Sequence, residues 1–371
     1  MENYNLLEEL IFNKPFTLRQ SDKEKILVKI FKEQLQNNKK NINIRSMYDK
    51  LGFDIKYFNS LEDIPYIPVN MFKKFDLYTC NKEEIVRVLN SSATTIGIPS
   101  KIYIDKKTSI RQSQALIATL RNFLGNKRRP LLVIDSEDAN KNGSVLTARG
   151  AAIRGISNFS NKIVYAMDKD GEELKLNIER LKDFESQYGE EEVLVYGFTY
   201  IIWSKFIKTI QENNIKLNIP KIKIVHSGGW KKLNSQRVTK KEFSTTLGNI
   251  FKTKPSNVLD FYGMVEQLGV VFIDCQCGYK HVPDFAEIII RDLTTLEEVN
   301  IGESGLIQVM STLSSSYPAQ AILTEDIGTL VGIDDCKCGR KGKYFKFESR
   351  VEKAEIRGCG DTFAEGEKRN G

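Results

Sequence analysis

The segment VLVYGFTYIIWSKFIKTIQENNIKLNIPKIKIV, residues 193–225, carries the pattern that decides the fold. Val193–Phe198 is an apolar run of strand length, Ile201–Asn213 has the periodicity of an amphipathic helix, and Ile222–Val225 is a second apolar strand. A strand, a helix and a strand in this order predict a parallel sheet with helices on its faces. We therefore expect an α/β protein.

The same alternation begins near residue 89 and continues toward the C-terminus. Strands are predicted at Lys101–Asp105 and Leu131–Asp135, and a helix at Thr108–Leu124 with Thr108 as its cap. Three more strands predict an appended, more antiparallel region: Val270–Asp274, Phe285–Arg291 and Gly305–Ser311. Parallel and mixed sheets with flanking helices are expected in one chain.

The N-terminal residues follow a helical pattern instead. Ser21-Asp22-Lys23-Glu24 has the form of a capping box and is predicted to open a helix at Lys25–Asn37. We therefore expect three regions: a mainly helical region at 1–88, a core at 89–345 and a short C-terminal remnant at 346–371.

Composition excludes some classes of function. Of 371 residues, 41% are hydrophobic and 28% are charged, which is typical of a folded chain with a sizeable core. The net charge of +7 comes from 55 basic and 48 acidic residues spread along the sequence. Because no dense Lys/Arg stripe occurs, nucleic acid is not the expected partner.

Nothing in the sequence predicts a membrane or secreted protein. No apolar run reaches the length of a membrane span, and the segment Met1–Asn5 lacks the basic and apolar parts of a signal peptide. Six cysteines in a chain of this size favour free thiols or a metal site over disulfides. We therefore expect a cytoplasmic location.

A hydroxyl-rich loop precedes the strand at 101–105. In SSATTIGIPS, residues 91–100, the hydroxyls of Ser91, Ser92, Thr94 and Thr95 and the backbone N–H groups could wrap the phosphates of a nucleotide. The loop lacks the Gly-Lys-Ser/Thr ending of a P-loop, so an ordinary polar loop is the alternative.

Two more turns follow predicted strands. At Gly228-Gly229-Trp230-Lys231 the backbone could approach a flat ligand closely, since Gly228 and Gly229 have no side chains. In Tyr262-Gly263-Met264-Val265-Glu266-Gln267, the carboxylate of Glu266 could hold Mg²⁺ that bridges phosphate oxygens. The alternatives are a packed Trp230 and a solvated Glu266.

An acid and a base complete the pattern. Asp326, in Thr324-Glu325-Asp326-Ile327-Gly328, could accept hydrogen bonds from two ribose hydroxyls, and Arg350, after Ser349, could reach ribose or phosphate. Each motif is weak evidence by itself, but five in a fixed order predict one nucleotide site. Its candidate residues are Ser91, Ser92, Thr94, Thr95, Gly228, Gly229, Tyr262, Gly263, Glu266, Asp326 and Arg350.

The cysteines form a second group. Cys275-Gln276-Cys277-Gly278 and Cys336-Lys337-Cys338-Gly339 are two copies of a Cys-x-Cys-Gly motif. Four thiolates suit tetrahedral Zn²⁺, and a site with no open position would be structural. His281 is a possible substitute ligand, and four unrelated cysteines are the alternative. The two histidines, His226 and His281, have no spacing that suggests a hydrolase triad.

Cys359 stands apart, in Arg357-Gly358-Cys359-Gly360-Asp361. The flanking glycines would let the thiol swing, and the neighbouring Arg357 favours the thiolate. Cys359 is therefore a candidate nucleophile, with an ordinary turn cysteine as the alternative.

Together these motifs resemble those of the acyl-protein synthetases of bacterial bioluminescence (the LuxE-type family), which belong to the adenylate-forming superfamily with the phenylacetate–CoA ligases. The resemblance covers roughly residues 85 to 361. It includes the loop at 91–100, Gly197-Phe198-Thr199-Tyr200, Gly229-Trp230-Lys231, Phe261–Gln267, Ser316-Tyr317-Pro318, Thr324–Gly328 and Arg350–Asp361.

The resemblance implies a fold of the adenylate-forming N-terminal-domain type with a truncated C-terminal lid. It also implies that a carboxylic acid, in this family a fatty acid, reacts with Mg-ATP to give an acyl-adenylate and pyrophosphate. Cys359 would then take the acyl group and pass it to an acceptor protein such as an acyl reductase. Glu266 would hold the metal, the hydroxyl loop the pyrophosphate, and Asp326 with Arg350 the ribose.

The chain departs from the family pattern at several positions. Ala93 and Ile96 replace the two glycines of the hydroxyl loop, Val265 replaces a threonine, and Ser349 replaces the glycine before Arg350. The changes at Ala93, Ile96 and Val265 keep open the alternative of a weakened nucleotide-binding scaffold protein. A CoA ligase of the phenylacetate type is a second alternative. A nucleic-acid-binding zinc protein is a more distant alternative.

Overall fold

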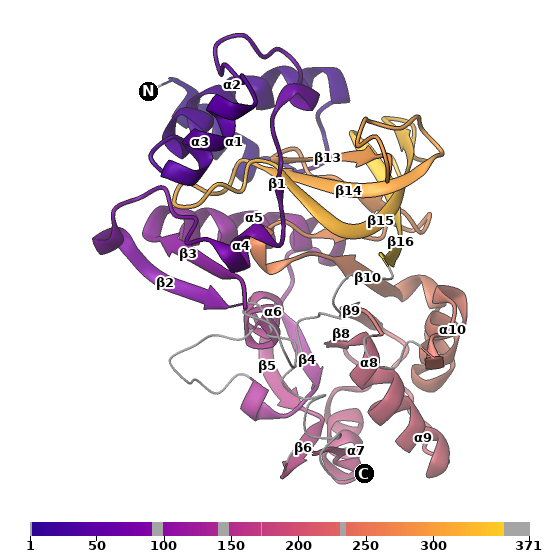
Figure 1. Ribbon diagram of the computed structural model, residues 1–371. Coiled ribbons are helices and arrows are strands. Elements are labelled where there is room, and N and C mark those ends of the chain that lie inside the picture. Colours follow the sequence, from indigo (N-terminus) through magenta and orange to yellow (C-terminus); the bar gives the residue numbers. More distant parts are fainter. Residues whose placement is uncertain (1, 91–98, 140–147, 172, 231–234, 352–371) are drawn as a thin grey trace. The chain divides into compact units, whose positions relative to one another are not determined.

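The alternating strands and helices of the middle of the chain form a parallel sheet. The structure, a computed structural model, describes residues 2–90, 99–139, 148–171, 173–230 and 235–351 (Figure 1). The chain divides into two compact units. Of the described residues, the first unit comprises 2–90, 99–123 and 262–351, and the second comprises 124–139, 148–171, 173–230 and 235–261.

The parallel sheet belongs to the second unit, and its neighbouring strands run in the order β5-β4-β8-β9-β10. The bounds are β4 Arg129–Ile134, β5 Ser160–Tyr165, β8 Val193–Phe198, β9 Ile222–Ser227 and β10 Val258–Tyr262. Every residue of β8 is buried, which explains its continuous apolar run. The parallel sheet predicted from residues 193–225 is confirmed.

Helices and one small hairpin complete the second unit: α6 Ala148–Ser157, α7 Ile178–Tyr188, α8 Thr199–Ile201, α9 Lys208–Glu212, α10 Lys240–Phe251, and the strands β6 Met167–Asp170 and β7 Glu173–Leu176. The helix predicted at 201–213 begins two residues earlier, and its middle, Ile202–Ile207, is a π-helix. Asn177 caps α7 by accepting from the backbone N–H of Arg180 at 2.8 Å.

The antiparallel region belongs to the first unit. Its sheet has the order β12-β16-β15-β14-β13, and β1 pairs with β15 in parallel. The bounds are β1 Ile67–Pro68, β12 Lys280–His281, β13 Ala286–Arg291, β14 Ser304–Ser311, β15 Ile322–Ile333 and β16 Lys343–Arg350. The strands predicted at Phe285–Arg291 and Gly305–Ser311 are confirmed as β13 and β14 of this antiparallel sheet, and residues 346–350 continue its strand β16. The strand predicted at Val270–Asp274 was assigned to the wrong sheet: it is β11, Phe272–Ile273, which pairs with β10 at the edge of the other sheet.

The N-terminal helices pack in the same unit as this sheet (Figure 1). They are α1 Glu2–Phe12, α2 Gln20–Asn38, α3 Ile42–Lys50 and the short α4 Met71–Lys74, followed by the hairpin of β2 Ile85–Asn90 and β3 Lys101–Asp105 and by α5 Lys106–Leu124. Leu27, Ile30, Phe31 and Leu35 are buried on one face of α2. The helical region predicted at 1–88 is thus grouped with the antiparallel sheet.

Two helix starts differ from the prediction. Helix α2 begins at Gln20, so Ser21 lies inside the helix and the expected capping box does not form. Instead, the carboxylate of Asp334 accepts from the backbone N–H of Gln20 at 3.0 Å, a cap supplied by a distant segment. Helix α5 begins at Lys106, and Asp105 accepts from the N–H of Thr108 at 2.7 Å, so Thr108 is inside the helix.

Buried charges join α2 to this sheet. The Lys23 Nζ lies 3.2 Å from a Glu287 carboxylate oxygen with both side chains buried, and Lys343 lies 3.5 Å from Glu298.

Burial raises the pKa of Glu298 to about 7, and a hydrogen bond with Glu62 adds to the increase. The folded protein therefore holds a proton on Glu298 well above the ordinary pKa of 4.5.

This proton predicts a pH-dependent stability. Because the folded state binds the proton more tightly than the unfolded state, the contribution is complete below about pH 4.5 and disappears as pH rises through about 7. Glu298→Gln cannot ionise. We therefore expect it to reduce the loss of unfolding free energy between acid and neutral pH by roughly 2 kcal/mol, a figure lowered for the partial solvent exposure of Glu298. Urea unfolding across this range measures the difference. The control is the exposed neighbour Glu297→Gln, and equal pH slopes in both variants would contradict the assignment.

Among the residues that the structure describes, no helix combines the length and apolarity that a bilayer crossing requires.

Candidate active site

Three predicted nucleotide-site residues meet in the first unit. Asp326 on β15 lies opposite Arg350 on β16 in the antiparallel register. The Arg350 Nε–H donates to Oδ1 of Asp326 at 3.0 Å, and the Tyr262 hydroxyl donates to Oδ2 at 2.8 Å. Asp326 is 5% exposed, so both carboxylate oxygens are held by charge and hydrogen bonds in a largely dry position.

Hydrogen bonds of Thr324 fix the backbone at Asp326. The Thr324 hydroxyl donates to the carbonyl of Ile307 on β14 at 2.7 Å and accepts from the N–H of Asp326 at 3.1 Å. This side chain ties the two strands together immediately before the acid. Burial lowers the pKa of Arg350, but the adjacent Asp326 outweighs it and the net change is upward, so the guanidinium stays charged.

Aromatic packing fixes Tyr262. Its ring stacks on Phe272 at 5.9 Å between centroids, contacts Phe347 at 5.2 Å and meets the edge of Phe345 at 6.3 Å. Burial, and then the charge of Asp326, raise the pKa of Tyr262 well above its ordinary value. The hydroxyl therefore remains a hydrogen-bond donor at neutral pH.

Glu266 shares the electrostatic environment of this group. It is buried in a short 3₁₀ turn, Val265–Gln267, and burial raises the pKa of its carboxyl group. The Ser100 hydroxyl and the charge of Arg350 act in the opposite direction. A buried carboxyl group of this kind fits a divalent cation, because a bound cation would compensate its lost hydration. Glu266 was predicted to be a solvated side chain in the alternative interpretation, and that alternative is wrong.

Several predicted residues cannot be placed with this group. Ser91, Ser92, Thr94, Thr95 and Cys359 lie outside the described residues, and Gly263 directly follows Tyr262 with partial exposure. Gly228 and Gly229 belong to the second unit. Gly228 has φ +80°, and a Cβ there would lie 3.0 Å from the ring of Phe198, so glycine is required by both backbone and space.

Trp230 has aromatic neighbours within the second unit. Its ring lies 5.6 Å from Trp203 and 6.2 Å from Phe243, both in edge-to-face geometry. The Phe243 ring also contacts His226 at 4.6 Å between centroids. This packing matches the alternative interpretation, in which Trp230 is part of an aromatic cluster.

Sequence reasoning missed a polar cluster at the carboxyl ends of the parallel strands. Asp135 follows β4 and forms a buried ion pair with Arg149 of α6, while Thr199 follows β8 and its hydroxyl lies 2.9 Å from Nδ1 of His226. Burial raises the pKa of Asp135, and Arg149 opposes the increase. Ligands of open α/β sheets bind at this edge. The sequence contained one indication of this cluster: a polar residue, Asp135 or Thr199, directly follows each of these buried apolar strands.

The cysteines assemble differently from the prediction. Ligand atoms of Cys275, His281, Cys336 and Cys338 all lie within 4.8 Å of one another. His281 Nε2 is 3.2 Å from the sulfur of Cys338, and the sulfurs of Cys275 and Cys336 are 3.9 Å apart. Cys277 is not in this group. The structure therefore has His281 as the fourth member in place of Cys277, as in the alternative that made His281 a substitute ligand. Pairing of β12 with β16 brings His281 to the hairpin of Cys336 and Cys338.

The backbone around these cysteines has the form of a metal-binding knuckle. The N–H of Cys277 donates to the sulfur of Cys275 at 3.3 Å, and the N–H of Cys338 does the same for Cys336. Gly278 and Gly339 follow with φ of +81° and +85°, values that favour glycine and close each turn. Burial lowers the pKa of His281 to about 4, so its imidazole is neutral and able to ligate.

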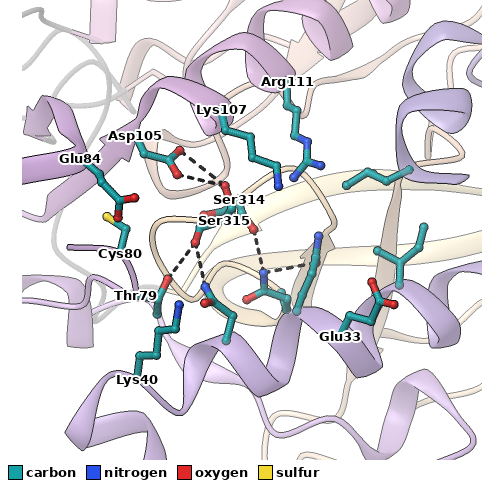
Figure 2. A pocket seen from close by; sticks show the side chains of 15 residues that line it. Glu33, Lys40, Thr79, Cys80, Glu84, Asp105, Lys107, Arg111, Ser314 and Ser315 are labelled. Atoms are coloured by element: carbon teal, nitrogen blue, oxygen red, sulfur yellow. Dashed lines mark hydrogen bonds between the residues drawn. The ribbon is translucent and has the colours of Figure 1, made fainter. Parts of the chain in front are cut away.

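The first unit also contains a polar cavity of about 310 Å³ (Figure 2). Lys107 and Arg111 extend toward it from α5, and Glu33 and Lys40 lie on the opposite side. Ser315 donates to the carboxylate of Asp105 at 3.2 Å across its wall. Of the described residues that line this cavity, none belongs to the nucleotide site predicted from the sequence.

The fold of this chain is shared with a solved CoA ligase. A crystal structure of 2-hydroxyisobutyryl-CoA ligase superposes on this chain with a TM-score of 0.68 at 15% sequence identity, covering 91% of this chain and 77% of that one. At this identity the likeness shows the fold alone. The expected fold class is confirmed.

The family model of the acyl-protein synthetase LuxE matches residues 2–367, and the chain therefore belongs to this family. Two curated relatives are long-chain-fatty-acid–luciferin-component ligases. The Aliivibrio fischeri protein is 24% identical over 73% of this chain and 70% of its own length. The Vibrio harveyi protein is 24% identical over 86% of this chain and 82% of its own length. The chain is thus an enzyme of the ligase class.

Proposed function

We propose that this protein activates a carboxylic acid, most simply a long-chain fatty acid, with ATP and transfers the acyl group to a protein thiol. The observation that carries the proposal is the hydrogen-bonded group of buried Asp326 with Arg350 and Tyr262 in a chain of this family. The fatty acid comes from the names of the relatives, which act on long-chain fatty acids.

The chemistry proceeds in two steps. A carboxylate oxygen attacks the α-phosphorus of ATP, the α–β phosphoanhydride bond breaks, and pyrophosphate leaves, giving an acyl-adenylate. A thiolate then attacks the acyl carbon, and AMP departs with the electron pair of the broken C–O bond. The protein contributes by holding the reactants in line and by stabilising the developing charge.

The described residues suit the ribose end of ATP. Each oxygen of Asp326 accepts one hydrogen bond from the protein and keeps a lone pair for a ribose hydroxyl. Arg350 neutralises the acid and lies beside the position where ribose or phosphate would bind. For the phosphates we propose the loop of Ser91, Ser92, Thr94 and Thr95, and for the flat base Gly228 and Gly229.

Magnesium is the proposed metal cofactor of the reaction, with Glu266 as its protein ligand. Mg²⁺ would neutralise charge on the phosphate oxygens of ATP during displacement. Glu266 fits this role because its carboxylate is buried and lies in the field of Arg350 and Asp326. The proposed acyl acceptors are Cys359 and then a partner protein such as an acyl reductase.

ATP–pyrophosphate exchange tests the first step. We expect exchange that requires both Mg²⁺ and a carboxylic acid, strongest within a panel of fatty acids of increasing length, and a loss of about 100-fold in Glu266→Gln. Exchange that no acid supports, despite ATP binding, would contradict the proposal and favour the scaffold alternative.

A CoA ligase is the second candidate function, because the fold is shared with a CoA ligase. Hydroxylamine trapping separates the two. A protein-bound thioester releases acyl hydroxamate from precipitated enzyme without CoA, whereas a CoA ligase gives a soluble thioester in proportion to the CoA supplied. Dependence on CoA would replace acyl-protein transfer as the conclusion.

Zinc is the proposed structural cofactor, held by Cys275, His281, Cys336 and Cys338. Three sulfurs and one imidazole nitrogen in a compact group match the tetrahedral sites that zinc prefers. We expect about one zinc ion per purified chain and its loss in Cys336→Ser, measured by mass spectrometry of metals. Purified wild-type protein without bound metal would exclude this site. The cytoplasmic location remains a prediction from cysteine usage.

A further inference from the structure

The proposed zinc site and the proposed ribose site lie on one hairpin. Strands β15 and β16 pair from Asp326 opposite Arg350 to Ile333 opposite Lys343, and the turn between them carries Cys336 and Cys338. Asp326 and the cysteines are therefore near opposite ends of the same two-stranded element. A constraint on the turn restricts the hairpin that carries both ribose-site residues.

The other two zinc-site residues come from a segment with little regular structure of its own. Cys275 precedes the turn at Gly278, and His281 ends the two-residue strand β12. Lys280 and His281 pair with Phe345 and Tyr344 of β16, and the His281 and Tyr344 rings stack at 5.4 Å. A strand of two residues is too short for independent stability. A metal that joins Cys275 and His281 to Cys336 and Cys338 would fix this pairing.

Packing continues from this pairing to the ribose site. Phe345, which pairs with Lys280, meets Phe272 at 5.2 Å, and Phe272 stacks on Tyr262 at 5.9 Å. The Tyr262 hydroxyl donates to Asp326 at 2.8 Å. Rings on both sides of Tyr262 thus belong to segments that the metal would join.

We propose that zinc bound by Cys275, His281, Cys336 and Cys338 clamps the β15–β16 hairpin to β12 and thereby positions Asp326, Arg350 and Tyr262 for the nucleotide. The inference rests on the proposed adenylating function and adds a role for the metal in ATP affinity. The four ligands are positioning residues, because they act on ATP through Tyr262 and the hairpin.

The second cysteine of each Cys-x-Cys-Gly copy allows a matched test in the full chain. Cys338→Ser removes a member of the group, whereas Cys277→Ser removes a thiol of the same motif that lies outside it. Zinc content, circular dichroism and ATP affinity by calorimetry are measured for each variant. We expect Cys338→Ser to lose zinc and bind ATP about tenfold more weakly, and Cys277→Ser to retain zinc and ATP affinity.

Exchange kinetics separate positioning from partial unfolding. Positioning predicts that the KM for ATP rises while the KM for the acid is unchanged; partial unfolding lowers kcat and leaves both KM values unchanged. If Cys338→Ser does not fold, the same measurements are made on wild-type protein before and after chelation, with circular dichroism as the check of the fold.

The outcomes distinguish the two proposals. Wild-type protein that lacks zinc, or that binds ATP equally well after losing it, overturns the clamp and leaves the adenylating function standing. Equal zinc loss in Cys277→Ser and Cys338→Ser also overturns it, because the ligand set would then differ. Wild-type protein that neither binds ATP nor catalyses exchange overturns both proposals.

Discussion

Cys359→Ser is expected to abolish covalent acylation of the protein while leaving ATP–pyrophosphate exchange within about twofold of wild type. A serine hydroxyl is a far weaker nucleophile than a thiolate at neutral pH. The acyl-adenylate would still form, because no part of Cys359 is assigned to that step. Incubation with radiolabelled fatty acid and ATP, followed by gel electrophoresis, measures the protein-bound acyl group.

The controls for this experiment are other thiols of the chain. Cys80 is half-buried beside the cavity of the first unit, and Cys277 lies outside the zinc-site group. Cys80→Ser and Cys277→Ser are expected to label as wild type does. Labelling that persists in Cys359→Ser but disappears in one of the controls would assign the nucleophile to that other cysteine.

Asp326→Asn is expected to lower kcat/KM for ATP by about 100-fold. Asparagine keeps the shape of the side chain but removes the charge that faces Arg350 and offers one acceptor oxygen in place of two. The loss has two causes. The variant binds ribose more weakly, and the partly buried guanidinium of Arg350 loses its ion pair with Asp326. Exchange kinetics at varied ATP concentration measure it.

Two further variants serve as comparisons for the loss expected in Asp326→Asn. Tyr262→Phe retains the stacked ring and loses one hydrogen bond to Asp326, so a smaller loss of about 5- to 10-fold is expected. Glu348→Gln changes a carboxylate of the same hairpin that accepts a hydrogen bond from the Ser304 hydroxyl, and this variant should leave the KM for ATP unchanged. An Asp326→Asn enzyme with wild-type KM for ATP would remove Asp326 from the nucleotide site.

The strands that are buried on both faces were the most predictable parts of the fold. Val193–Phe198 agrees with the structure at both ends, because every position of a central parallel strand must be apolar or small. The helix starts were less predictable. Ser21 had the right sequence for a capping box, but a carboxylate from Asp334 occupies the helix start and moves it to Gln20.

In the candidate sites, the residues themselves were predictable from the sequence, but their contacts with one another were not. Asp326, Arg350 and Tyr262 of the proposed nucleotide site could be chosen from residue chemistry and from their place in the predicted pattern of strands and turns. Their mutual contacts could not, since Tyr262 and Asp326 are brought together by packing among Phe272, Phe345 and Phe347. The pair of Asp135 and Arg149 was missed because neither residue forms a motif with its sequence neighbours.

The sequence by itself determined the α/β class, the family and the types of residue that we propose as nucleotide and metal ligands, because these depend on local apolar periodicity and on side-chain chemistry. The tertiary structure alone decided that His281, and not Cys277, joins Cys275, Cys336 and Cys338. It also decided that Asp326 faces Arg350 across two strands. Strand register and ring packing set these pairings, and both arise from contacts between residues that are far apart along the chain.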